Sequence, residues 1–226
     1  MPHETNKNTL AATRSIDTPP DGAGRAVPGR APALFGDRMA FLRGFLTRPR
    51  EVASVLPSSR FLEGRVVRAA ELAAARCVVE LGPGTGGTTR ALLRALGPQA
   101  RLLAIELNPD FCARLRQRIR DPRLLLQAGS AESLGDYLAR HDLPAPDAVI
   151  SGIPFSTMPQ EVAQRIAAAV DASLAPGGRF VAYQLRPHVA DYVAPHLGAP
   201  RQVWEWRNLP PMRVFRWAKG AGDDAG

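Results

Sequence analysis

Short apolar runs alternate with amphipathic helical stretches from about residue 76 onward. The apolar runs indicate strands at Cys77–Leu81, Arg101–Leu107, Leu124–Ala128, Ala148–Ser151 and Arg179–Leu185. The helical stretches between them cover Thr88–Leu96, Asp110–Arg120, Ala131–Arg140 and Gln160–Leu174. Repeated β-α-β units predict a mainly parallel sheet with helices on both faces, because parallel neighbours need a crossover connection.

Two further strand-like runs follow, at Gln202–Arg207 and Arg213–Ala218. No long helix separates them, so we expect an antiparallel pair at one edge of the sheet. With the five earlier runs they make seven strands. The pattern therefore predicts an α/β fold with a Rossmann-like, seven-stranded, mainly parallel sheet over residues 76–218.

The region before the sheet divides into two parts. Residues 1–33 are rich in Thr, Asn, Pro, Gly and Ala without any hydrophobic period, which predicts a disordered leader; a similar composition predicts a flexible tail at 219–226. From Leu34 to Leu46 apolar positions recur at helical spacing with arginines nearby, and a second helical stretch runs from Ser59 to Ala75. We expect residues 34–75 to form a helical extension. Its apolar stripe either lies in a membrane interface or packs on the domain as a lid.

Composition adds a preference for an anionic partner. Of the 226 residues, 45% are hydrophobic and 22% charged, which is ordinary for a globular protein. The net charge of +8 favours nucleic acid or an acidic membrane surface without choosing between them. Two cysteines, Cys77 and Cys112, are too few for a disulfide framework and fit a reducing compartment. Because neither a signal peptide nor a run of about 18–20 apolar residues is found, we expect a cytoplasmic protein that associates peripherally with the inner membrane.

A glycine-rich turn after the first strand carries the strongest local signal. It contains Gly82, Gly84, Thr85 and Gly86. Glycines let such a turn tighten and let a ligand approach the backbone. Glu80 would repel a pyrophosphate at this turn and attract a cationic or amine-bearing ligand, and Glu106, at the end of the next strand, can accept hydrogen bonds from ribose hydroxyls. The alternative is that these residues only shape a turn.

The turn resembles the first motif, E/D-x-G-x-G-x-G, of the class I S-adenosylmethionine-dependent methyltransferases. The resemblance implies S-adenosylmethionine as cofactor, with Glu80 and the glycines around its amino acid part. It also implies that Glu106 holds the ribose and that Leu107 lies against the adenine.

The ends of the third and fourth strands complete the cofactor site that the resemblance implies. Relatives often carry G-D-A after the third strand, and the Asp reads the adenine amine. Here the segment is Ser130-Ala131-Glu132, so Ser130 replaces that Asp. We expect Glu132 to substitute in that contact. The expected cofactor-binding residues here are Ser130, Ala131 and Glu132, with Ser151 at the end of the fourth strand.

The loop after the fourth strand bears on the substrate. It reads Ser151-Gly152-Ile153-Pro154-Phe155 and resembles the N-[IL]-P-[YF] motif of RNA adenine-N6 dimethylases. In those enzymes the Asn side chain and the Pro carbonyl accept from the target amine, and the aromatic ring stacks on the flipped base. Gly152 stands where that Asn would be. Since glycine lacks the acceptor, RNA methylation is disfavoured and nucleic acid is not the expected partner.

A broader resemblance covers about residues 35–218. Bacterial phospholipid N-methyltransferases combine the glycine motif with S-G-[IL]-P, N-[LI]-P-P-[AM]-x-V, P-x-x-[VI]-[GA] and P-S-S elements. The matching segments here are Ser151–Pro154, Asn208–Val214, Pro49–Ala53 and Pro57–Ser59. The resemblance implies methyl transfer to the amine of phosphatidylethanolamine, and to its mono- and dimethyl forms, toward phosphatidylcholine at a membrane surface.

Three alternatives remain open. The acceptor would be another amine lipid, such as ornithine lipid, or a small amine; the enzyme would act on RNA adenine; or the chain would bind membranes without catalysis. The intact Glu80 and glycines count against the last of these.

The motif resemblances imply the candidate residues in the loop after the fourth strand, and Tyr183 is added from its position at the end of the fifth strand. The expected catalytic set is Tyr183, Ser151, Gly152, Ile153 and Pro154. The expected substrate contacts are Phe155, Arg186 and Arg213, of which the arginines would hold a lipid phosphate. Tyr183 would accept from the amine or relay its proton, unless it packs in the core; the substrate phosphate is the other group that would take the proton. No Cys/His cluster suggests a metal, and the oligomeric state and the number of methyl groups stay open.

Overall fold

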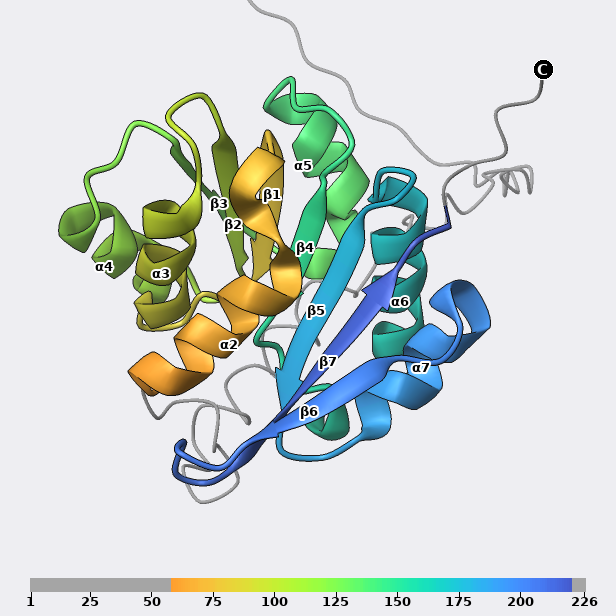
Figure 1. The fold of residues 1–226 in the computed structure, drawn as a ribbon. Helices are drawn as coiled ribbons and strands as arrows, with labels where there is room; N and C mark the ends of the chain where they lie inside the picture. The colour runs from red at the N-terminus through yellow and green to blue at the C-terminus, as the bar shows by residue number, and fades with distance from the viewer. Residues whose placement is uncertain (1–57, 221–226) are drawn as a thin grey trace, which may run out of the picture. The chain divides into compact units, whose positions relative to one another are not determined.

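The computed structural model describes residues 58–220, which contain one seven-stranded sheet (Figure 1). The strands are β1 Cys77–Leu81, β2 Arg101–Glu106, β3 Leu124–Ala128, β4 Ala148–Ser151, β5 Arg179–Gln184, β6 Arg201–Glu205 and β7 Met212–Ala218. Their order is β3-β2-β1-β4-β5-β7-β6. Strands β1 to β5 are parallel, whereas β7 runs antiparallel to both β5 and β6. The predicted fold class and the antiparallel pair at the edge are confirmed.

Helices cover both faces of the sheet (Figure 1). They are α2 Arg60–Ala70, α3 Gly87–Ala95, α4 Pro109–Arg118, α5 Leu134–Arg140, α6 Gln160–Ser173 and α7 His188–Leu197. One hydrophobic core lies on each face of the sheet. Successive residues of β1 contribute to opposite cores, because successive strand side chains point to opposite faces. Val78 packs with α2 and α3, whereas Cys77, Val79 and Leu81 pack with α5, α6 and α7. Cys77 and Cys112 are both free and buried.

Helix α2 belongs to the packed sheet structure. The Ser59 hydroxyl accepts from the backbone N–H of Leu62 and caps the helix. Leu62, Val66 and Ala70 recur every four positions and are buried against the sheet. The predicted leader and the Leu34–Leu46 stripe lie outside the described residues. Within 58–220, no helix combines the length and apolar character needed to cross a bilayer.

Helix α7 was not predicted, because prolines stand at both of its ends. Pro187 comes just before the first turn, where its missing N–H costs little, and Pro195 lies in the last turn. The helix forms because Val189 and Val193 bury one face in the core beside α6.

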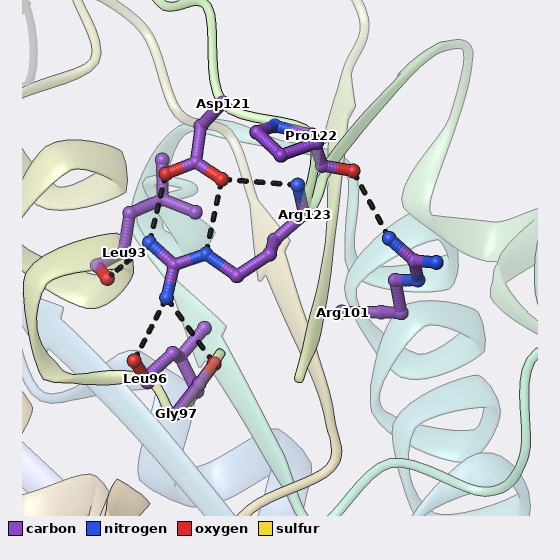
Figure 2. Close-up of polar contacts among 7 residues, drawn as sticks. All are labelled: Leu93, Leu96, Gly97, Arg101, Asp121, Pro122 and Arg123. Atoms are coloured by element: carbon purple, nitrogen blue, oxygen red, sulfur yellow. Dashed lines mark hydrogen bonds and ion pairs between the residues drawn. The ribbon is translucent and has the colours of Figure 1, made fainter. Parts of the chain in front are cut away.

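An arginine clamp fixes the end of α3 that lies farthest from the glycine turn (Figure 2). Arg123 donates from Nη2 to the carbonyl of Leu93 over 2.8 Å and from Nη1 to that of Leu96 over 2.8 Å. Asp121 holds the same guanidinium through both carboxylate oxygens, at 3.0 and 2.8 Å. Because α3 begins at the glycine turn, the clamp anchors the helix that presents the turn.

Candidate functional site

The glycine turn adopts a backbone that other residues rarely reach. Gly82, Gly84 and Gly86 have φ values of 73°, 53° and 84°. A Cβ at Gly86 would lie 2.5 Å from Leu115 Cδ2, so that glycine also permits close packing of α4. At Gly84 a Cβ would meet no atom within 4 Å, so the middle of the turn faces open space where a ligand can approach.

Glu80 lies fully buried below the turn, and no basic side chain is among the described groups that shift its pKa. Neither carboxylate oxygen makes a well-formed hydrogen bond within residues 58–220. Burial raises the pKa of Glu80 to about 8; the carboxylates of Glu106 and Glu63 act in the same direction, and the nearby Thr89 hydroxyl offsets only part of the rise. A buried, unpaired carboxyl of this kind favours a cationic ligand.

Glu106 faces the glycine turn from the end of β2. Its Oε2 accepts from the backbone N–H of Gly84 over 3.1 Å, and its Oε1 accepts from that of Asn108 over 2.9 Å. Burial raises the pKa of Glu106, and these two backbone donors oppose the rise. The carboxylate therefore lies beside the turn, where a ribose reader is expected.

The segment after β3 is held by its own polar contacts. Ser130 Oγ donates to Glu132 Oε2 over 2.8 Å, and Arg165 Nε donates to Glu132 Oε1 over 2.6 Å. Ala131 is buried, and Leu107 at the end of β2 is exposed. Both Glu132 oxygens are thus engaged within the protein, which weakens Glu132 as a reader of adenine.

A cavity of about 450 Å³ opens at the carboxyl ends of β1, β4 and β5, within the range of small-molecule sites. The predicted residues that line it are Gly82, Gly84, Thr85, Gly152, Pro154, Tyr183 and Arg186. The lining residues without a predicted role are Ser58, Leu62, Pro83, Gly87, Thr88, Ser156, Thr157, Gln184, Leu185, Asn208 and Met212. The glycine turn and the loop after β4 therefore share one cavity.

Tyr183 fills the space behind Gly152. The Tyr183 hydroxyl lies 3.2 Å from Thr88 Oγ1. A Cβ at Gly152 would overlap that hydroxyl, would lie 2.9 Å from Tyr183 Cζ and would lie 3.1 Å from the carbonyl oxygen of Gly82. Burial, with the charge of Glu80, raises the pKa of Tyr183, so its phenol stays protonated at neutral pH. A side chain longer than hydrogen does not fit at position 152 unless Tyr183 moves.

Four of the predicted catalytic and substrate-contacting residues do not line the cavity: Ser151, Ile153, Phe155 and Arg213. Phe155 is fully buried, and its ring stacks on Tyr192 with centroids 6.3 Å apart. Its predicted contact with substrate is not supported, because the short helical turn after Pro154 carries the ring into the core. The Ser151 hydroxyl is also buried and accepts from the backbone N–H of Ile153 over 3.3 Å.

Arg213 is turned toward the edge strand. Its guanidinium lies 4.6 Å from the centroid of the Trp204 ring, a cation–π contact across the β6–β7 pair. The structure therefore does not bring Arg213 to the cavity beside Arg186.

Three of the lining residues without a predicted role lie in two motifs that the sequence had singled out. Asn208 and Met212 belong to the N-L-P-P-M-R-V run and Ser58 to the P-S-S element. The motifs were visible, but nothing in the local pattern indicated that the two segments meet. Thr88 carried no signal beyond its place in the helix after the glycine turn.

Comparison with known proteins places these features in context. A methyltransferase domain model matches residues 78–178. The ornithine lipid N-methyltransferase of Singulisphaera acidiphila is 32% identical over 181 residues, covering 79% of this chain and 94% of that protein. The ribosomal RNA small subunit methyltransferase A of a Burkholderia species is 39% identical over 92 residues, covering 41% of this chain and 32% of that protein.

Solved structures share the fold at low sequence identity. The 1,6-didemethyltoxoflavin-N1-methyltransferase of Burkholderia thailandensis matches with a TM-score of 0.59 and 20% identity, covering 86% of this chain and 93% of that one. The N-methyltransferase NodS of Bradyrhizobium japonicum matches with a TM-score of 0.57 and 16% identity, covering 70% and 94%. These likenesses concern the fold alone.

Proposed function

Because this chain belongs to the class I S-adenosylmethionine-dependent methyltransferases, we propose that it methylates the amine of a membrane lipid head group, with ornithine lipid as the first candidate substrate. The observation that carries this proposal is the match along nearly the whole length of an ornithine lipid N-methyltransferase. The motifs alone put phosphatidylethanolamine first. The relative favours the opposite order, so phosphatidylethanolamine becomes the second lipid to test.

The residues of the glycine turn fit the family's cofactor. S-adenosylmethionine, when bound, supplies a methyl group activated by a positively charged sulfur. Glu80 offers that cation a buried carboxyl group whose oxygens make no well-formed hydrogen bond within residues 58–220, and Gly84 leaves open space above the turn. Glu106 presents its carboxylate at the next strand end. We assign the cofactor's cationic part to the neighbourhood of Glu80 and its ribose to Glu106.

The hydroxyl groups of Tyr183 and Thr88 are the candidate partners of the acceptor amine in the same cavity. Tyr183 and Thr88 lie 3.2 Å apart, and both line the cavity with the glycine turn. Since its raised pKa keeps Tyr183 protonated, its role is to orient the amine through its oxygen rather than to act as a free phenolate base. The amine must lose its ammonium proton before its nitrogen can accept the methyl group, and with Tyr183 protonated the head group's own anionic oxygen or solvent takes that proton. Holding the neutral amine in line with the methyl group supplies much of the acceleration expected for such a transfer.

Arg186 is placed to bind the anionic part of the head group. It is exposed and lines the cavity beside Leu185, at the end of β5. Both candidate lipids combine an amine with an anionic oxygen group, and a guanidinium pairs well with either a carboxylate or a phosphate. Binding of the anionic group by Arg186 would direct the amine of the same head group toward Tyr183.

Methylation of RNA adenine is the competing activity, because several partial relatives are named for ribosomal RNA. The packing of Tyr183 against Gly152 argues against it. An Asn side chain at position 152 would occupy the volume of the tyrosine ring, so the adenine-reading arrangement does not fit this cavity.

A three-substrate assay tests the proposal. The full chain is incubated with methyl-labelled S-adenosylmethionine and either ornithine lipid or phosphatidylethanolamine in detergent micelles, or 16S ribosomal RNA. Label in ornithine lipid, resolved by thin-layer chromatography, supports the proposal, and label in phosphatidylethanolamine alone moves the substrate to the second candidate. Label in RNA alone overturns it. Glu80→Gln removes the carboxyl group assigned to the cofactor, so it should lose activity and serves as the matched control.

A further inference from the structure

Exposed apolar side chains gather at the end of the sheet that carries the cavity. Trp206 and Leu209, in the β6–β7 turn, are 69% and 87% exposed, and Leu185 after β5 is also exposed. The strand register brings these segments together, because Gln184 pairs with Arg213 and Glu205 pairs with Met212. Figure 1 shows the β6–β7 turn extending past the end of β5.

The charges around these side chains are basic. Residues 185–187 and 206–211 contain arginines and no acidic residue. Arg207 and Arg60 both pack over the Phe61 ring, 4.2 and 4.9 Å from its centroid. The adjacent Glu205 is buried, and Arg65 and Arg207 pair with it at 2.7 and 3.1 Å.

We propose that the β6–β7 turn docks on an anionic lipid bilayer, with Trp206 and Leu209 entering the interface. Indole and leucine side chains flanked by arginines match the layered chemistry of that interface. A second copy of the chain is the weaker occupant, because a stable dimer buries about 800 Å² per partner and a narrow turn with two large apolar side chains presents far less.

Docking at this turn would bring the bilayer to the cavity entrance. Leu185, Arg186 and Asn208 belong to the same two segments and also line the cavity. A lipid head group would then reach Tyr183 while its acyl chains stay in the membrane. The choice of a lipid surface rests on the proposed function, whereas the position of the surface rests on the exposure and charge described above.

Vesicle flotation tests the docking separately from catalysis. The full chain is mixed with vesicles of phosphatidylglycerol and phosphatidylcholine, which offer no amine to methylate. The Trp206→Ser/Leu209→Ser double variant should bind at least about tenfold more weakly than the wild type. Val203→Ser, which alters an exposed apolar residue on β6 set back from the turn, should bind like the wild type. Equal flotation of the double variant overturns the proposal.

Tryptophan fluorescence tests the docking without relying on that variant's folding. Lipids with brominated acyl chains should quench the wild-type emission, and Trp206→Phe should lose most of this quenching while still floating. Wild-type emission that is unaffected by the brominated lipid would exclude the bilayer. So would a double variant that binds vesicles like the wild type but no longer self-associates on sedimentation, because the turn would then serve a second copy of the chain.

The double variant should keep its activity on amine lipid in detergent micelles. Failure of the wild type in that micelle assay counts against the proposed function and leaves the docking result standing.

Discussion

Ser59 and Asn208 are joined by a hydrogen bond although 149 positions separate them. The backbone N–H of Ser59 donates to Asn208 Oδ1 over 2.9 Å, and Asn208 Nδ2 donates to the carbonyl of Pro210 over 2.8 Å. Asn208 is buried and lines the cavity. The bond therefore ties the start of α2 to the β6–β7 turn across one wall of the site.

Asn208→Ala should loosen this wall. The Ser59 N–H would lose its partner, so we expect the free energy of unfolding to fall by about 1–2 kcal/mol and the KM for lipid to rise more than kcat falls. Urea denaturation and methyl-transfer kinetics measure the two effects. Asn208→Asp keeps an acceptor for Ser59 and should fall between the wild type and the alanine variant. Unchanged stability and KM in Asn208→Ala would contradict this role.

Gly152→Ala should disrupt the cavity because its methyl group overlaps the Tyr183 hydroxyl. We expect a loss of activity of more than about 100-fold, since a displacement near 1 Å at a reacting centre has effects of that size. Gly97→Ala is the matched control, because a Cβ there meets no atom within 4 Å. The overlap should also lower the free energy of unfolding of Gly152→Ala. Removing the Tyr183 hydroxyl, in a Gly152→Ala/Tyr183→Phe variant, should recover part of that loss. Normal activity in the single variant would show that Tyr183 can move aside.

Cofactor affinity should depend on pH through Glu80. Burial raises the pKa of Glu80 to about 8, so most of the free protein carries a protonated Glu80 at pH 6.5. A cationic ligand favours the carboxylate, so binding releases a proton and affinity rises with pH, by up to about tenfold per pH unit below pH 8. Calorimetry in buffers of different ionisation heat measures both the number of protons released and the affinity at each pH. The same titration with Glu80→Gln subtracts the ligand's own ionisation, and an identical pH profile would rule out this linkage.

The same group should make stability fall as pH rises. The pKa of Glu80 is near 4.5 when unperturbed and about 8 in the folded chain, so the folded state holds the proton more tightly. This contribution is fully present below pH 4.5 and is lost as pH rises through 8. Relative to Glu80→Gln, the free energy of unfolding of the wild type should fall by on the order of a few kcal/mol between pH 5 and 8.5. Urea midpoints at several pH values measure the difference, and parallel curves for the two proteins would refute it.

Arg123→Ala should reduce stability and leave the chemistry of the site intact. The clamp joins Arg123 to backbone oxygens at the end of α3 and to Asp121 (Figure 2). It lies just before β3 begins, whereas the cavity lies at the carboxyl ends of the strands. We expect a loss of about 2–3 kcal/mol in the free energy of unfolding, with kcat at 20 °C nearly unchanged. Arg101→Ala removes one exposed hydrogen bond to the Pro122 carbonyl and should cost less than about 0.5 kcal/mol. Equal losses in the two variants would argue against the clamp.

Strand positions were predictable because they depend on local pattern. Cys77–Leu81, Leu124–Ala128 and Ala148–Ser151 have the predicted bounds, since strands in a covered parallel sheet form short apolar runs. Helix α7 was missed because Pro195 signals a break, while the burial that holds the helix comes from distant segments.

The residue order by itself determined the α/β class, the glycine turn and the acidic residues at the ends of β1 and β2. Each of these depends on neighbours within about four positions along the chain. Only the tertiary structure decided that Tyr183 lies behind Gly152, that Phe155 turns into the core and that Asn208 meets Ser59. These contacts depend on sheet register and on side-chain packing between segments tens of positions apart, which no local period records.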